Sequence, residues 1–243
     1  MFPITHIWFS RRVLGYINNM TVLGSVFPDA VKSCLTYDQT HNVGWGLYEY
    51  LKEYEEEYLD FARAVFTHTV YPEGLDFYSD ERYGDGYKGY CFQKAAVIEE
   101  EVIEACNIPE SFGLWKAHNF IEMGIEMNII EAERELIDIF REGLADSSRI
   151  RELSSLLDRY FGLEDRSVCS CLRRFASFME LRDLSSLALA YRYNTQMQIR
   201  HGISINISKC GDIIEKSRYI VQEDFEGFID FCTTKVENML KEE

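Results

Sequence analysis

Apolar residues recur at three- and four-residue spacing along most of the chain, which is the pattern of helices that bury one face. Only four prolines occur, and the second half continues this pattern almost without interruption. The pattern predicts an all-α fold, a multi-helix bundle. Expected helices span roughly 5–18, 42–57, 58–70, 90–106, 111–143, 147–161, 166–181, 184–201 and 210–241.

Residues 71–89 break the helical pattern. The segment combines four glycines with several tyrosines and aspartates. Two interpretations stay open: a loop that folds over a site and offers hydroxyls and carboxylates, or a surface crossover without a special role. A second break near residues 143–148 suggests a division into a helical domain over 1–145, which contains four of the five histidines, and a helical C-terminal half over 146–243, packed together as one globular unit.

Composition and charge limit the function classes. Of the 243 residues 47% are hydrophobic, which is enough for a substantial core. The net charge of −16, without a visible cluster of Lys and Arg, argues against a nucleic acid polymer as partner. No stretch has the pattern of a signal peptide or a membrane span, so we expect a cytoplasmic protein without stable membrane insertion. Self-association is left open.

Four of the five histidines lie at separated points in the first half: His6, His41, His68 and His118. The last begins a His118-x-x-x-Glu122 pair, and residues four apart share one helix face, so both side chains could reach one cation. The alternative is a core histidine hydrogen-bonded to Glu122. Asp29 follows Pro28 at the end of an apolar run, and the proline predicts that Asp29 lies on a turn. The alternative is that Asp29 caps the next segment.

These residues occur in a recognisable order. The chain contains Pro3-Ile4-Thr5-His6, Leu23-Gly24-Ser25-Val26-Phe27-Pro28-Asp29, Thr40-His41, Ala64-Val65-Phe66-Thr67-His68 and His118-Asn119-Phe120-Ile121-Glu122. In this order, over about half of the chain, it resembles the zinc-dependent phospholipase C family, which is similar in fold to the S1/P1-type nucleases. The resemblance implies an all-helical fold around up to three zinc ions, and hydrolysis of phosphoester bonds.

The resemblance also implies a ligand set. His6 would bind one metal, Asp29, His41 and His68 another, and His118 with Glu122 the remaining one. Asp29 is the candidate catalytic residue, either as a ligand or as the group that deprotonates the nucleophile. Imidazole and carboxylate ligands make zinc the first expectation and leave iron, manganese and nickel open.

The chain departs from the family's pattern after His68. The family normally has an aspartate four residues later, where this chain has Pro72, and a further histidine about ten residues on, where it has Phe77-Tyr78-Ser79-Asp80. Glu73, Asp76 or Asp80 could substitute. The family's processed N-terminal amine is a further ligand, expected to be missing because this chain begins with an ordinary Met1.

Two function classes remain. The first is a metal-dependent phosphoester hydrolase that acts on a small phosphorylated or phospholipid-like substrate. The second is a non-catalytic helical protein that retains the fold, with or without one metal, and serves as a binding or interaction module. The carboxylates of residues 72–80 decide between them, since hydrolysis by a metal cluster needs one of them to face the histidines.

Overall fold

The computed structural model describes residues 1–54, 56–179 and 183–241, and within these ranges the chain is all-α without a strand. The expected fold class is therefore confirmed. By their contacts the residues form two units, each assembled from three stretches of chain. Unit 1 comprises 1–2, 79–133 and 181–229, and unit 2 comprises 3–78, 134–180 and 230–243. The division expected at residue 145 stays a prediction.

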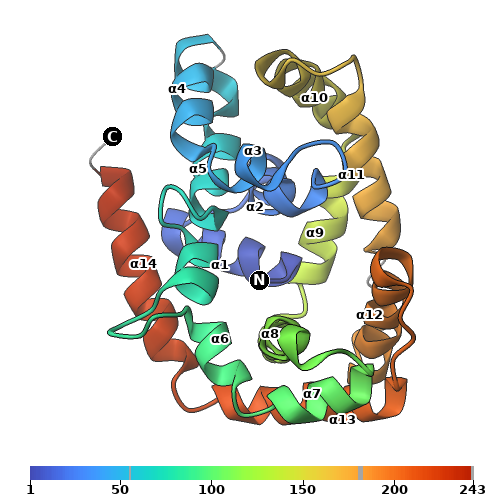
Figure 1. The fold of residues 1–243 in the computed structure, drawn as a ribbon. Coiled ribbons are helices and arrows are strands. Elements are labelled where there is room, and N and C mark those ends of the chain that lie inside the picture. The colour runs from blue at the N-terminus through green and yellow to red at the C-terminus, as the bar shows by residue number, and fades with distance from the viewer. Residues whose placement is uncertain (55, 180–182, 242–243) are drawn as a thin grey trace. The chain divides into compact units, whose positions relative to one another are not determined.

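The helices of each unit can be followed in Figure 1. Unit 2 contains α1 (Pro3–Leu14), α2 (Asn19–Ala30), α3 (Tyr37–His41), α4 (Gly44–Tyr54), α5 (Leu59–His68), α9 (Leu136–Ala145), α10 (Ser147–Phe161) and α11 (Ser167–Phe178). Unit 1 contains α6 (Tyr90–Ala95), α7 (Glu99–Cys106), α8 (Gly113–Ala132), α12 (Ser186–His201) and α13 (Ile207–Val221). The last helix, α14 (Phe225–Lys241), contributes its first residues to unit 1 and the rest to unit 2.

Three of the expected helices are each divided in two. The span 111–143 is α8 and α9, 210–241 is α13 and α14, and 90–106 is α6 and α7. The break after α8 has a tertiary reason, because α8 belongs to unit 1 and α9 to unit 2. Hydrophobic periodicity continues across such a break, so the pattern alone does not reveal it. The end expected at 181 for the helix that begins at 166 lies outside the described residues.

The expectation that Pro28 places Asp29 on a turn is wrong. Pro28 lies inside the last turn of α2, which continues through Asp29 to Ala30. The helix begins with a capping box in which Asn18 accepts from the amide of Thr21. A proline there removes only one backbone hydrogen bond, and burial of Phe27 and its neighbours on both sides of the helix outweighs that loss.

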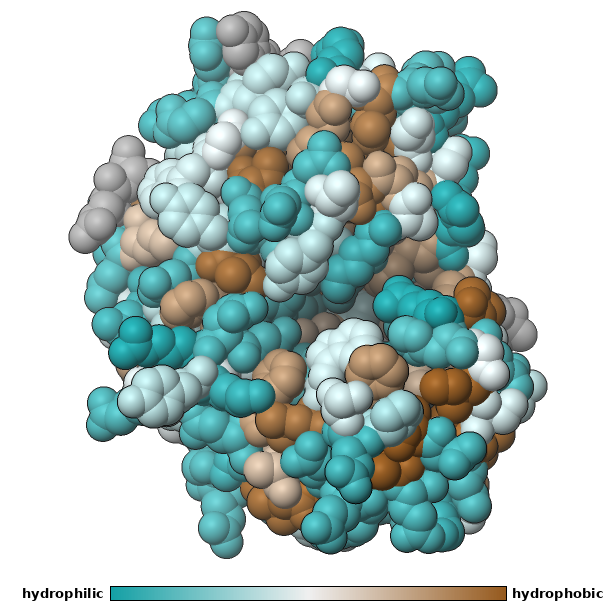
Figure 2. Space-filling view, in the orientation of Figure 1, coloured by the Kyte–Doolittle hydropathy of each residue, from teal (hydrophilic) through white to brown (hydrophobic). Residues whose placement is uncertain are grey.

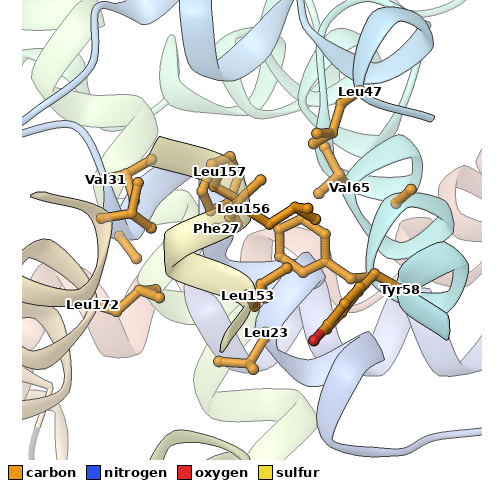
Figure 3. Close-up of a cluster of buried hydrophobic side chains, with 14 of the residues drawn as sticks. Leu23, Phe27, Val31, Leu47, Tyr58, Val65, Leu153, Leu156, Leu157 and Leu172 are labelled. Carbon is orange, nitrogen blue, oxygen red and sulfur yellow. The ribbon is translucent and has the colours of Figure 1, made fainter. Parts of the chain in front are cut away.

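The core of unit 2 forms where α2 packs against α5. Figure 3 shows Leu23 and Phe27 of α2, with Val31 just after it, meeting Leu47, Val65 and the α10 leucines in one buried cluster. Gly24 allows the two helices to approach closely, because a Cβ atom there would lie 2.2 Å from the carbonyl oxygen of Phe61. This approach fixes the end of α2 beside the end of α5, where the candidate site lies.

In unit 1, α8 packs against α6, α7 and α13, and α12 packs against α13. Most of α8 is buried, including its polar residues His118, Glu122 and Glu126. Hydrophilic side chains dominate the face of the molecule that Figure 2 shows. Among the described helices, none carries a long enough apolar stretch to span a bilayer.

Candidate metal centre

Three histidines of unit 2 surround one carboxylate. Oδ1 of Asp76 lies 3.3 Å from Nε2 of His6, and Oδ2 lies 3.2 Å from Nε2 of His68 and 3.6 Å from Nε2 of His41. The histidines come from α1, α3 and the last position of α5. All four side chains are buried. The fold thus gathers four residues, spread over 71 positions of the chain, into one group.

The segment after α5 turns back and thereby places Asp76. The backbone amides of Val70 and Tyr71 both donate to the carbonyl oxygen of His41, which holds this segment against α3. The amide of Gly74 then donates to the carbonyl oxygen of Thr69, which closes a tight turn. Asp76 follows two residues later, eight residues beyond His68 rather than four.

The imidazoles of His6 and His41 are held in the neutral form that binds metals. The rings of His6 and His68 stack with centroids 3.5 Å apart and an angle of 5° between their planes. Burial, and then the charge of His68, lower the pKa of His6 well below its ordinary value. Burial lowers the pKa of His41 to about 4 against the opposing effect of Asp76. At neutral pH these two rings therefore keep lone pairs that can bind a cation.

Hydrogen bonds on the far side of two rings select the tautomer. Nδ1 of His68 donates to the carbonyl oxygen of Ser25 over 2.6 Å. Nδ1 of His41 lies 2.7 Å from Oγ1 of Thr40, whose hydroxyl donates to backbone carbonyls one turn back. The threonine oxygen must therefore accept from His41. In both rings the lone pair is left on Nε2, the atom that faces Asp76, as in metal-binding histidines.

Asp29 completes a second group of potential ligands in unit 2. Its carboxylate has atoms within 4.8 Å of ligand atoms of His41 and His68, while His6, His68 and Asp76 form the first such group. Nζ of Lys32 lies 2.5 Å from Oδ1 of Asp29, and the Asp29 side chain remains 19% exposed. Burial alone would raise the pKa of Asp29, but the charges of Lys32 and His68 lower it below its ordinary range.

Buried ring nitrogens without partners support a metal in this group. Three buried ring nitrogens form no well-formed hydrogen bond with the described residues. They are Nδ1 and Nε2 of His6, and Nε2 of His68. Buried polar atoms in folded proteins nearly always have a partner, and a bound metal ion can serve as that partner. Three imidazoles and two carboxylates form a competent donor set for a divalent transition metal.

Unit 1 contains a separate group. Ligand atoms of Asp80, His118 and Glu122 lie within 4.8 Å of one another. The ring of Phe92 stacks on His118, and burial lowers the pKa of His118 to about 4 although Asp80 opposes this. The amino group of Met1 lies 3.0 Å from Oε1 of Glu122. This group also could hold a metal ion.

The structure thus brings together the residues singled out from the sequence, in two sets. His6, Asp29, His41 and His68 lie in unit 2, and His118 with Glu122 lies in unit 1. Asp76 joins the first set and Asp80 the second, and both come from the segment for which two interpretations were open. Glu73, the third carboxylate considered there, instead accepts a hydrogen bond from Tyr78. Metal binding itself stays a prediction.

Replacing Thr40 with valine tests the orienting hydrogen bond. The valine keeps the shape of the side chain but removes the oxygen that accepts from Nδ1 of His41. We expect metal affinity to fall by about 10–100-fold, the usual effect of losing such a partner. Isothermal titration with zinc measures this, and Thr40→Ser, which keeps the acceptor, should stay near wild type. Equal affinity of the valine variant would contradict the assigned tautomer.

The metal-free protein should lose stability on mild acidification. Unfolded histidine takes up a proton below pH 6.5, whereas buried His41 and His118 do so only near pH 4. The unfolded state therefore binds more protons as the pH falls through this window, so the contribution is complete above pH 6.5 and lost toward pH 4. Each histidine accounts for about 3 kcal/mol of unfolding free energy. Urea unfolding with a chelator present, from pH 7.5 to 4.5, measures this dependence, and His41→Gln should flatten it.

Comparisons with known proteins found no relative of this chain. No protein-family model, no curated protein and no solved structure matches the chain. The resemblance to the zinc-dependent phospholipases C therefore rests on the residues quoted above, and membership of that family stays a prediction.

Proposed function

We propose that the protein is a metal-dependent phosphoester hydrolase whose catalytic metals bind in unit 2. The observation that supports this most is the position of Asp76, a buried carboxylate within 3.6 Å of three imidazole nitrogens. This chain has Pro72 where the phospholipase C family has an aspartate, so hydrolysis requires another carboxylate that faces the histidines. Asp76 meets that requirement.

The ligands of unit 2 divide into two sets, and unit 1 supplies a third. His6 and Oδ1 of Asp76 would bind one ion, and Asp29, His41 and His68 another. Because Oδ1 and Oδ2 of Asp76 face different histidines, its carboxylate could serve both ions. Asp80, His118 and Glu122 of unit 1 would bind a further ion. Zinc suits these donors best, with iron, manganese and nickel as alternatives.

Each residue then has a chemical role. Divalent cations held by these residues would supply a water of lowered pKa as the nucleophile and would offset the charge of a phosphoryl transition state. Asp29 has a pKa below its ordinary range, so it is ionised at pH 7 and a weak base. A ligand role therefore suits Asp29 better than the role of general base. Ser25 and Thr40 keep the imidazoles oriented through their hydrogen bonds.

The negative net charge of the chain favours a small substrate over a polyanionic one. A chain with a net charge of −16 repels a polyanion, whereas one phosphate group can be balanced by the metals. We therefore propose a small phosphorylated or phospholipid-like compound as substrate rather than a nucleic acid polymer.

Metal content and hydrolysis, measured on one preparation, test the proposal. We expect elemental analysis to find two or more transition-metal ions per chain, and the loaded protein to hydrolyse bis(4-nitrophenyl) phosphate or a short-chain phosphatidylcholine. His68→Ala should bind fewer ions and lose hydrolysis. Asp138→Asn, which changes an exposed acid of α9, is the matched control. Absence of metal after reconstitution with zinc, manganese or iron would instead favour the non-catalytic binding module.

A further inference from the structure

A cluster of basic side chains in unit 1 has no acidic partner. Nζ of Lys116, near the start of α8, lies 3.0 Å from Nε2 of His201 at the end of α12. Arg200 precedes His201 in the last turn of α12. In the described parts of the chain, no carboxylate lies within ion-pair distance of these three groups. A chain with 41 acidic and 25 basic residues offers many potential partners, so this absence is notable.

Fold stability does not explain the position of Lys116. Its side chain is only 6% exposed, and removing a charge from water is costly unless a counter-charge compensates. It is also the fourth residue of α8, close to the positive end of the helix dipole, where a cation is unfavourable. Arg200 suits the last turn of α12, but it adds like charge near Lys116. Glu99 lies beside Gly113 at the start of α8 and pairs with none of the three.

Aromatic side chains border the cluster. Nζ of Lys116 lies 3.6 Å from the centroid of the Trp115 ring, whose plane is nearly perpendicular to that of His201. Phe112 packs edge-on against Trp115, and these two residues are 41% and 46% exposed. The ring face attracts the ammonium and partly offsets its burial. The exposed parts of both rings leave an apolar surface next to the positive charge.

We propose that Lys116, Arg200 and His201 form a binding site for the phosphate group of a small ligand, with Trp115 and Phe112 as its apolar wall. Lysine and arginine are the side chains that most often bind phosphate, and their donors would be shared with the anion. With Nε2 of His201 accepting from Lys116, Nδ1 carries the hydrogen and is a further donor. The site uses none of the proposed metal ligands and does not depend on hydrolysis.

Fluorescence of Trp115 reports on this site directly. In a Trp8→Phe/Trp45→Phe variant Trp115 is the only tryptophan, since the chain has three. Titration with inorganic phosphate at constant ionic strength should give a saturable change that persists when a chelator removes bound metals. Persistence separates this site from phosphate bound at the metal centre, so the two proposals can fail independently.

Charge-removing variants in the same background complete the test. Lys116→Gln and Arg200→Gln should each weaken phosphate binding at least tenfold. Lys209→Gln removes the same charge from a lysine paired with Glu104 and should stay within twofold. Arg200 is exposed, so its variant keeps the test decisive if Lys116→Gln misfolds. Tighter binding of phenylphosphonate than of phosphate would indicate an aryl phosphate ligand, and equal binding would indicate free phosphate. A change that chloride reproduces, or unaltered affinity in the Arg200 variant, would overturn the proposal.

Discussion

Asp76→Asn is expected to remove the metals of unit 2 and, with them, any phosphoester hydrolysis. Asparagine has nearly the same shape but lacks the charge that both oxygens of Asp76 present to His6, His41 and His68. Loss of a residue that only hydrogen-bonds to a metal ligand costs about 10–100-fold in metal affinity. Loss of Asp76, which is proposed to bind the ions itself, should therefore cost more than about 100-fold. The metal-free fold should change little, because asparagine keeps the shape of the side chain and its amide group can donate to a ring nitrogen that faces it.

Two measurements distinguish this outcome from misfolding. Elemental analysis after dialysis should find fewer ions in Asp76→Asn, while thermal unfolding of both chelated proteins should give similar midpoints. Asp138→Asn changes an exposed acid in the same unit and should keep the full metal content. If Asp76→Asn kept full metal content and activity, Asp76 would not be a ligand, and the proposal that its carboxylate serves both ions of unit 2 would fail.

The second large effect is expected from Gly24→Ala. The new Cβ atom would lie 2.2 Å from the carbonyl oxygen of Phe61 and 2.8 Å from Cβ of Ala64, so α2 and α5 must move apart. Overpacking of this kind costs about 3 kcal/mol of unfolding free energy when the backbone has to shift. Separation should also lengthen the hydrogen bond from His68 to Ser25 and displace Asp29 from His68. We therefore expect metal affinity to fall together with stability.

Gly227→Ala is the matched control for this substitution. Gly227 also lies inside a helix, but a Cβ atom there would meet nothing within 4 Å. Alanine in a helix interior is better than glycine by about 0.5–1 kcal/mol, so this variant should be slightly stabilised. Urea unfolding of both variants measures the contrast. A neutral effect of Gly24→Ala would show that the helices tolerate a wider spacing.

The sequence alone determined the features that depend on local periodicity. Recurrence of apolar residues gave the all-α fold, and the spacing of four placed His118 and Glu122 on one face of α8. The order of the histidines also identified which side chains to expect together, although it did not show that they meet. Local patterns succeed here because helix geometry relates residues a few positions apart.

The tertiary structure decided everything that depends on burial and on contacts between distant segments. The local sequence predicts that Pro28 ends the helix. Packing of α2 against α5 instead keeps Pro28 inside α2 and places Asp29 near His41 and His68. The division of 111–143 into α8 and α9 follows from their membership of different units. Of the carboxylates Glu73, Asp76 and Asp80, Asp76 is the one that faces the histidines of unit 2, because the turn after α5 returns the chain to His41. These outcomes have a common physical reason: each residue's place is set by the free energy of packing with partners far away in the chain, which no short-range pattern encodes.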